Sequence, residues 1–533
     1  MKRFIKNIFP AVALMLCTAG LSSCIGDLDV TPIDPNKNTT LNPEDLFNMC
    51  YANFGLEGLD GPGSSTVTAQ DGGTTGLVRQ YFNVNELTTD EAICAWGDKG
   101  VATMNVNTYD ASNSFIAFYY NRLYSGISVC NQYLKVASDV DATRTAEVRF
   151  LRALQFYLAM DAFGNITLPL TISTEKPVQR SRADVYAWLE KELMEIEPLL
   201  PDAKAKTSSD ANYGRADKAA VWMLLSRLYL NAQVYTGTAQ WEKAAEYAKK
   251  VIDSPYKLYT KASNGYSAYR KLFMGDNGES GASIEAVFPI LQQGDKTAGY
   301  GCGTFLTAST HGGSMNSNGV NNTWEGNRVR KDLIQKFFPN NDAPLDKDSA
   351  VLKAAKDDRA LFWGKDRTLD ILTANDIKDF KKGFSTTKFV ALHSDGKAGT
   401  DTKFTDADFF FFRSAEAYLT YAEATARLNN GRTTTEGTDC INQLRTRANV
   451  QTLMRSYTLR EILDERSREF YFEGLRRTDL IRYGYFGGNN TYMWSWKGGV
   501  VDGRPFESYR NIFPLPTTEI SVGGGVLKQN PDY

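Results

Sequence analysis

The sequence predicts a mostly α-helical protein, in which tetratricopeptide-like helix pairs form a scaffold and long irregular loops form a ligand-binding face. Apolar residues recur at helical spacing in several separate segments. Between two of these helical blocks, 256–408 is rich in Gly, Asn and Asp and has few clear periods. A long irregular stretch inside a compact protein is usually functional. The chain has 533 residues, 42% hydrophobic and 23% charged, which is ordinary for a globular protein.

The N-terminus carries the pattern of a bacterial lipoprotein. Lys2, Arg3 and Lys6 precede an apolar stretch at 8–21, which is short for a membrane span and suits a signal peptide. It ends in Leu21-Ser22-Ser23-Cys24, which resembles a lipobox. We expect a signal peptide over 1–23 and acylation of Cys24; the alternative is a plain signal peptide that contains a cysteine. A Pro/Asn-rich tether follows, and 55–76 reads as a loop because it is rich in Gly, Ser and Thr.

Helices are predicted over 146–163, which Gly164 ends, and over 183–199. The segment 216–252 reads as a helix pair, because Trp222-x-x-Leu225-Ser226-x-x-Tyr229 fits the first helix of a tetratricopeptide repeat. A weaker copy runs from 416 to 448, and a helix over 459–476 closes the set; a shorter helix is expected over 333–338. The mature body, 24–533, therefore divides into an N-terminal part at 24–255, a loop-rich insertion at 256–408 and a C-terminal part at 409–533.

Composition excludes several classes of function. Lys plus Arg (60) and Asp plus Glu (62) nearly balance, which argues against nucleic-acid binding. His311 and His393 are the only histidines, and no CxxC spacing occurs, so the usual zinc motifs cannot be written. The five cysteines beyond Cys24 are expected to be buried thiols.

Several stretches together resemble the SusD/RagB family of outer-membrane lipoproteins. The resemblance rests on four sequence motifs, which are Glu147-Val148-Arg149-Phe150-Leu151-Arg152-Ala153, Phe412-Arg413-x-Ala415-Glu416-Ala417-Tyr418, Glu465-Arg466-x-Arg468-Glu469-Phe470-x-Phe472-Glu473-Gly474, and Phe513-Pro514-Leu515-Pro516. Within the family the chain most resembles the starch-binding member, through Asn85-Glu86-Leu87-x-Thr89-Asp90-Glu91 and Trp494-x-Trp496-Lys497-Gly498-Gly499. The resemblance implies a lipid-anchored protein on the cell exterior that captures starch or malto-oligosaccharides. It also implies a partner, a SusC-like TonB-dependent transporter.

The resemblance also implies a set of glycan contacts. An arc of aromatic side chains would receive the sugar at Trp96, Tyr300 and Trp324, and polar contacts fall at Arg79 and Asp71. Lys99 stands where the starch-binding member of the family has an asparagine, and an ammonium can still donate to a hydroxyl there. Aromatic side chains pack on the apolar faces of a sugar ring, and neighbouring polar side chains form hydrogen bonds with its hydroxyls. Core packing is the alternative for each aromatic residue.

Other motifs read as structural. The charges over 465–479 suggest a buried ion-pair network, and Trp494 and Trp496 suggest packing. Asp276-Asn277-Gly278-Glu279 has oxygen ligands suited to calcium but is too short for an EF-hand, so a turn is expected, with Asp276 and Glu279 as weak candidates for a structural calcium site. No other cofactor is expected.

The sequence thus favours a non-catalytic glycan-binding protein. A glycoside hydrolase is the competing class, although no pair of carboxylates stands out. The third hypothesis is a related binder of another cargo, such as fructan, host glycan or peptide.

Overall fold

The computed structural model describes residues 42–67 and 71–533, and residues 43–533 form one compact unit. The predicted signal peptide and Cys24 lie outside the described residues. Within the described ranges, no helix is both long enough and apolar enough to cross a membrane.

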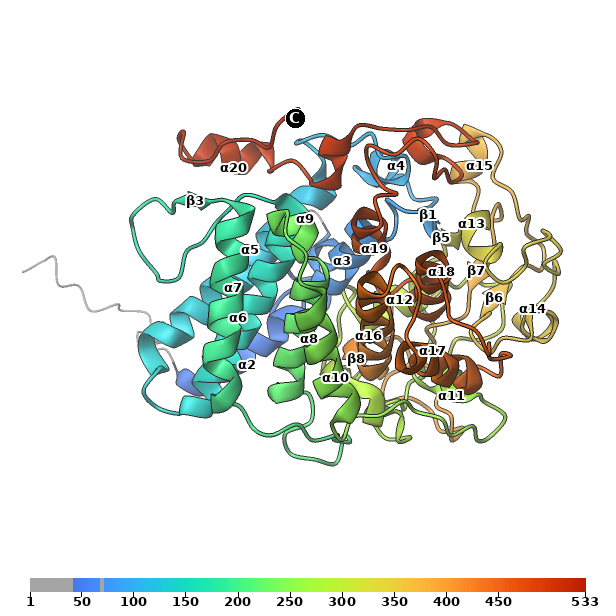
Figure 1. Ribbon diagram of the computed structural model, residues 1–533, viewed down its shortest axis with the longest axis horizontal. Helices are drawn as coiled ribbons and strands as arrows, with labels where there is room; N and C mark the ends of the chain where they lie inside the picture. Colours follow the sequence, from blue (N-terminus) through green and yellow to red (C-terminus); the bar gives the residue numbers. More distant parts are fainter. Residues whose placement is uncertain (1–41, 68–70) are drawn as a thin grey trace, which may run out of the picture. The chain divides into compact units, whose positions relative to one another are not determined.

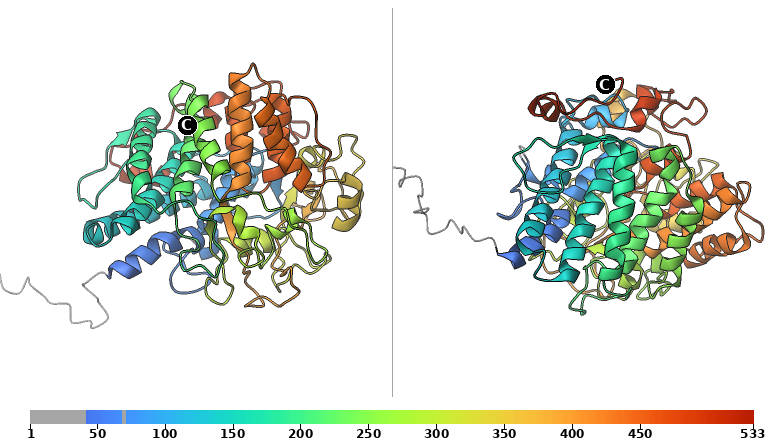
Figure 2. Two further views of the ribbon diagram at one scale, coloured as in Figure 1. Left: turned by 60° about the horizontal axis from the view of Figure 1, so that its bottom comes forward. Right: turned by 60° about the vertical axis from the view of Figure 1, so that its left-hand side comes forward.

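Long helices stand side by side in a row, as predicted (Figures 1 and 2). Each packs on its neighbour: α5 on α6, α6 on α7, α8 on α10, α10 on α16, and α16 on both α17 and α18. Helix–turn–helix pairs thus form the scaffold, which confirms the predicted fold class. The row consists of α5 (Ser114–Ala137), α6 (Ala142–Phe163), α7 (Arg182–Ile196), α8 (Lys218–Leu230), α10 (Trp241–Asp253), α16 (Ser414–Leu428), α17 (Thr435–Arg447) and α18 (Leu459–Phe470).

Local signals set the ends of these helices. The Asp141 side chain accepts from Arg144 N at 3.0 Å and caps the start of α6, and Gly164, at φ 71°, ends it. Thr458 and Glu461 form a capping box at the start of α18.

The helix predicted over 459–476 is wrong in its extent. It breaks after Phe470 and resumes as α19 (Arg476–Arg482), because Phe472 and Gly474 adopt positive φ values of 65° and 83°. Gly474 N donates to the buried Glu86 Oε1 at 2.5 Å, and a Cβ at position 474 would lie 2.2 Å from the Tyr81 ring. A tertiary contact thus ends the helix where the local pattern would continue it. The helix predicted over 333–338 is also shorter, as α13 (Lys331–Ile334) followed by turns.

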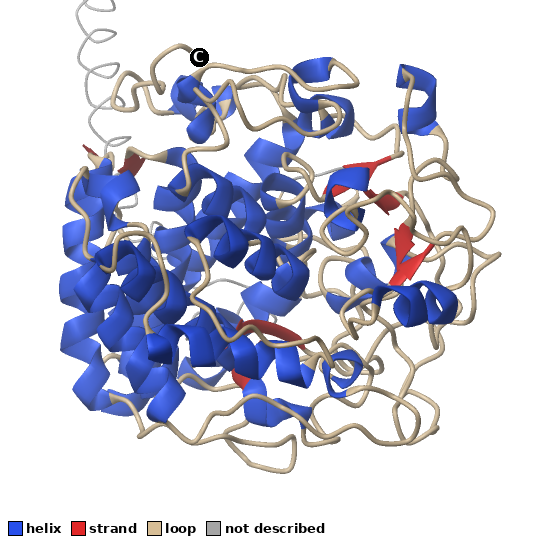
Figure 3. Ribbon diagram, turned by 45° about the vertical axis from the view of Figure 1, so that its right-hand side comes forward, coloured by secondary structure: helices blue, strands red, loops and turns tan. Residues whose placement is uncertain are grey.

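The chain over 256–408 is a set of loops joined by short elements, as expected (Figure 3). The strands of the described residues pair two by two and antiparallel: β1 (Ala92–Cys94) with β5 (Asn327–Val329), β2 (Ile166–Thr167) with β3 (Gln179–Arg180), β4 (Ala286–Ile290) with β8 (Phe409–Arg413), and β6 (Phe362–Trp363) with β7 (Ser385–Thr386). The remaining helices are α2 (Pro43–Gly55), α3 (Leu77–Asn85), α4 (Val101–Asn105), α9 (Ala232–Thr236), α11 (Ala268–Lys271), α12 (Gly303–Ser309), α14 (Asp348–Ala355), α15 (Ala374–Lys378) and α20 (Thr517–Val522), with 3-10 turns η2 (Gly72–Thr75), η3 (Glu197–Leu199), η4 (Ala282–Glu285), η5 (Lys497–Gly499) and η6 (Ser508–Asn511).

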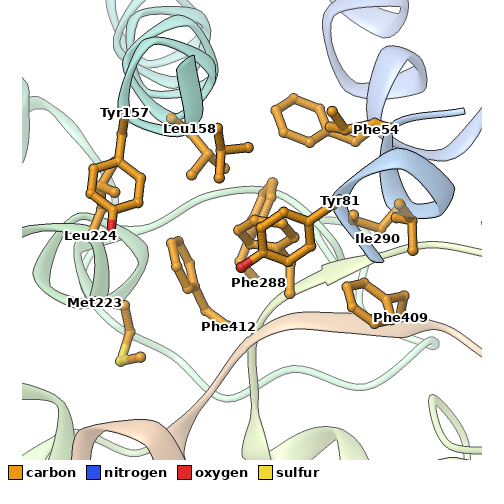
Figure 4. Close-up of a cluster of buried hydrophobic side chains, with 14 of the residues drawn as sticks. Phe54, Tyr81, Tyr157, Leu158, Met223, Leu224, Phe288, Ile290, Phe409 and Phe412 are labelled. Carbon is orange, nitrogen blue, oxygen red and sulfur yellow. The ribbon is translucent and has the colours of Figure 1, made fainter. Parts of the chain in front are cut away.

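The largest core joins the helical row to the loops. Strand β4 comes from the loop-rich region and β8 leads into α16, so their pairing places Phe288 and Phe412 between the helices (Figure 4). These two phenylalanines are buried, and so are Leu158 of α6 and Leu224 of α8. This shared core fixes the loops on the scaffold.

The charges over 465–479 form the predicted buried network. Arg359 Nη1 lies 2.7 Å from Glu465 Oε1, Arg413 Nη1 lies 2.6 Å from Glu469 Oε1, and all four side chains are buried. Each carboxylate is matched by a guanidinium, which is the condition for burying such charges. The structural interpretation is therefore confirmed.

Three smaller predictions are also confirmed. Trp494 and Trp496 are buried, and the Trp496 indole N–H donates to Ile371 O at 2.7 Å. The cysteines of the described residues are free and buried. Asp276–Glu279 forms a turn, in which the Asp276 carboxylate accepts from Ser394 N at 2.8 Å.

Within 42–67 and 71–533, no group of three or more His, Cys, Asp or Glu residues is arranged to hold a metal ion.

Candidate functional site

One open depression of about 490 Å³ gathers five of the six side chains predicted as glycan contacts. They come from four separate stretches of the chain. The lining residues are Asp71, Arg79, Trp96, Asp98, Tyr300, Asn322, Trp324 and Lys403.

A two-stranded ribbon brings the two tryptophans to the depression. Cys94 of β1 pairs with Asn327 of β5, and Ala95 N extends the ladder by donating to Gly326 O at 2.9 Å. Trp96 follows β1 directly and Trp324 precedes β5, so antiparallel pairing places them at the same end of the ribbon. Both side chains are half-buried.

Tyr300 is held in place by hydrogen bonds of its main chain and of the residue after it. Its N–H donates to Glu57 Oε1 at 2.7 Å, and the next carbonyl, Gly301 O, accepts from Arg79 N at 3.0 Å. A Cβ at Gly73 would lie only 2.5 Å from Tyr300 Cβ, so a glycine permits this close approach. The Tyr300 ring lies 5.7 Å from Trp324 and 5.3 Å from Phe404, centroid to centroid, with tilted planes.

Arg79 lies at the base of the depression and is 5% exposed. Its guanidinium carbon is 5.4 Å from the centroid of Trp96 and 5.2 Å from that of Phe305. Burial lowers the pKa of Arg79. The closest carboxylate oxygen within the described part of the chain is Asp71 Oδ2, 3.8 Å from Nη1, and the buried Nε has no hydrogen-bond partner there. A buried cation with unused donors is costly unless a ligand or water completes it.

Asp71 has a structural role and an exposed side. Its oxygens accept from Gly73 N at 3.1 Å and Thr74 Oγ1 at 2.9 Å, which caps η2, while 60% of the side chain stays exposed. The carboxylate therefore retains acceptor capacity toward the depression.

Lys99 is the predicted contact that the structure does not bring to the depression. It is exposed, in the turn before α4, and does not line the cavity. Its carbonyl accepts from Ser114 Oγ.

Sequence reasoning missed Asp98, Asn322 and Lys403, together with Phe404 behind Tyr300. Lys403 and Phe404 are distant in sequence from the other residues of the depression. The Asn322 side-chain amide donates to Lys403 O at 2.6 Å. The one available signal was a lone aromatic residue in the polar stretch Thr400-Asp401-Thr402-Lys403-Phe404-Thr405-Asp406.

Comparison with known proteins identifies the family. A family model described as "SusD family" matches residues 372–533, and one described as "Starch-binding associating with outer membrane" matches 63–230. The chain is 37% identical over 566 aligned positions to the "Starch-binding protein SusD" of Bacteroides thetaiotaomicron, covering 100% of this chain and 99% of that protein.

Solved structures share the fold at lower identity. A SusD-like protein from Bacteroides fragilis has a TM-score of 0.67 at 19% identity, covering 92% of this chain and 96% of the other. Surface glycan-binding protein A from Bacteroides fluxus has a TM-score of 0.65 at 19% identity, covering 92% and 99%. A laminarin-binding SusD-like protein gives 0.65 at 18%, with the same coverage. These structures show the shared fold, and the 37% identity to SusD over the whole chain establishes that the chain belongs to the SusD family.

Proposed function

We propose that the depression binds starch and malto-oligosaccharides without catalysing a reaction. The observation that carries the proposal is the buried Arg79 side chain, whose Nε has no hydrogen-bond partner among the described residues, in a depression edged by three half-buried aromatic residues. Hydroxyls of a sugar would accept from Arg79 and donate to Asp71, while Trp96, Tyr300 and Trp324 cover its apolar faces. The likeness to a starch-binding relative over the whole chain supports an α-glucan as the ligand.

Two further proposals concern location and delivery. The lipobox ending at Cys24 and the family description that mentions the outer membrane support an acylated protein at the cell exterior. Family membership supports delivery of the bound glycan to a SusC-like TonB-dependent transporter.

Titration of the purified protein with maltoheptaose tests the central proposal. We expect Trp96→Ala and Tyr300→Ala each to weaken binding by about 1–3 kcal/mol, the usual cost of removing an aromatic anchor, while the melting temperature changes little. Trp222→Ala is the matched control: this tryptophan is also half-buried, donates to Glu197 Oε1 at 2.7 Å and lies outside the depression.

Native gels containing starch, inulin or mucin glycans distinguish the cargo. Retention by inulin or mucin alone would replace starch with a fructan or host glycan, and retention by none would favour a peptide. Maltose or glucose released from starch by the wild-type protein would refute the non-catalytic assignment. Normal maltoheptaose affinity in both aromatic variants would move the site elsewhere.

A further inference from the structure

The depression contains a lysine that the family resemblance did not indicate. Lys403 lies on the loop before β8 and its side chain is exposed in the depression. It forms no ion pair with any residue of 42–67 or 71–533, whereas Lys397 on the same loop lies 2.7 Å from Asp395 Oδ2. Three ammonium donors therefore remain available toward a ligand.

The position of Lys403 is set on two sides. Its ammonium nitrogen lies 5.0 Å from the centroid of Tyr300 and 5.5 Å from that of Phe404, within the range of a cation–π contact. Its carbonyl accepts from the Asn322 amide at 2.6 Å, and its N–H donates to Asp401 Oδ1 at 2.6 Å. The hydrogen bonds fix the main chain of Lys403, and the cation–π contacts place its ammonium group beside the Tyr300 ring.

The loop itself is tied to the body of the protein. Asp406 Oδ1 accepts from Gly294 N at 2.7 Å, and its Oδ2 lies 3.1 Å from His393 Nε2. Asn321 N donates to Thr402 O at 2.7 Å. The segment 400–406 is therefore a fixed wall beside the Tyr300 ring.

We propose that Lys403, in place of Lys99, supplies the ammonium that donates to hydroxyls of the bound glycan and so strengthens binding beside Tyr300. This inference rests on the proposed glycan function and deepens it. The ligand class is a neutral, hydroxyl-rich saccharide, because Arg79 and Lys403 are matched in the depression by the two carboxylates of Asp71 and Asp98.

Calorimetric titration of the full chain with maltoheptaose tests the assignment. Lys403→Met keeps the apolar stem and removes the donors, and we expect Kd to rise about tenfold, or about 1.4 kcal/mol. Lys403→Arg should restore affinity to within about threefold, because its guanidinium still donates. Lys397→Met is the matched control and should bind like the wild type, and Lys99→Met should lose less affinity than Lys403→Met.

The outcomes separate this inference from the proposed function. Equal affinity of Lys403→Met and the wild type, while Trp96→Ala loses binding, overturns the role of Lys403 alone. So does a Lys403→Arg variant that binds no better than Lys403→Met, because the donors would then be irrelevant. A wild-type protein that does not bind maltoheptaose overturns both.

Discussion

Gly326 offers a test of the site that removes none of its side chains. It precedes β5 at φ 107°, and an added Cβ would lie 2.0 Å from Trp96 Nε1 and 2.6 Å from Trp96 Cδ1. Non-bonded heavy atoms prefer about 3.5 Å, so in Gly326→Ala the indole must move by about 1.5 Å. The indole would then leave its present position, where its centroid lies 6.2 Å from that of Phe305 and 5.4 Å from the guanidinium carbon of Arg79.

Two magnitudes follow for Gly326→Ala. Removal of the Trp96 indole would cost up to about 1–3 kcal/mol of binding free energy. A displaced indole should cost about 1–2 kcal/mol, which is a roughly five- to thirtyfold increase in Kd. Alanine at this positive φ costs about 1–3 kcal/mol of stability. For a chain of this size, that lowers the melting temperature by only about 1–3 °C, since the entropy of unfolding scales with length.

The assay is calorimetric titration with maltoheptaose beside a thermal melt. Gly97→Ala is the matched control, because a Cβ there meets no atom within 4 Å and its φ is not positive. The double variant Gly326→Ala/Trp96→Ala should bind no worse than Trp96→Ala, because both changes act through one ring. Additive losses, or wild-type affinity in Gly326→Ala, would refute the reasoning.

Two further predictions concern pH and anchoring. Burial raises the pKa of Asp408 to about 7, and its carboxylate accepts from Tyr213 Oη and Gln292 N at 2.7 Å each. The folded state therefore binds this proton more tightly than the unfolded state. The protonated Asp408 side chain contributes fully to the free energy of unfolding below the ordinary carboxyl pKa, and this stabilisation is lost as pH rises through about 7. Melts from about pH 5 to pH 8 should show the wild type falling relative to Asp408→Asn, and parallel curves would exclude Asp408 as the cause. For Cys24→Ala, we expect release of the protein from cell membranes without detergent, because the lipobox cysteine is the predicted anchor; continued need for detergent in fractionation would reveal another anchor.

The helical row was predictable because its signals are local. Apolar spacing and end residues such as Gly164 act within a few positions, and α6 ends at Phe163 as predicted, although it begins at Ala142, before the predicted start at 146. The break after Phe470 was not predictable in this way, since Gly474 is held by Glu86 from nearly four hundred positions away. Side-chain periodicity contains no record of such a contact.

The candidate site divides along the same line. Family resemblance supplied Trp96, Tyr300, Trp324, Arg79 and Asp71, and the structure brings these together. It also indicated Lys99, because the alignment could not show that the turn before α4 places it outside the depression. Lys403 was missed because it reaches the site through a loop docked by Asn322, a long-range contact.

The contrast between the ribbon and the wall has a consequence for how binding preferences can diversify. The tryptophans emerge from a backbone ladder, where a one-residue insertion would reverse which way the following side chains face. The 400–406 wall is instead a loop held by hydrogen bonds of individual residues such as Asn322 and Asp406, and loops tolerate changes of length and composition better than paired strands do. Exchanging this wall between homologues is therefore a direct way to engineer new carbohydrate selectivity on an unchanged aromatic platform.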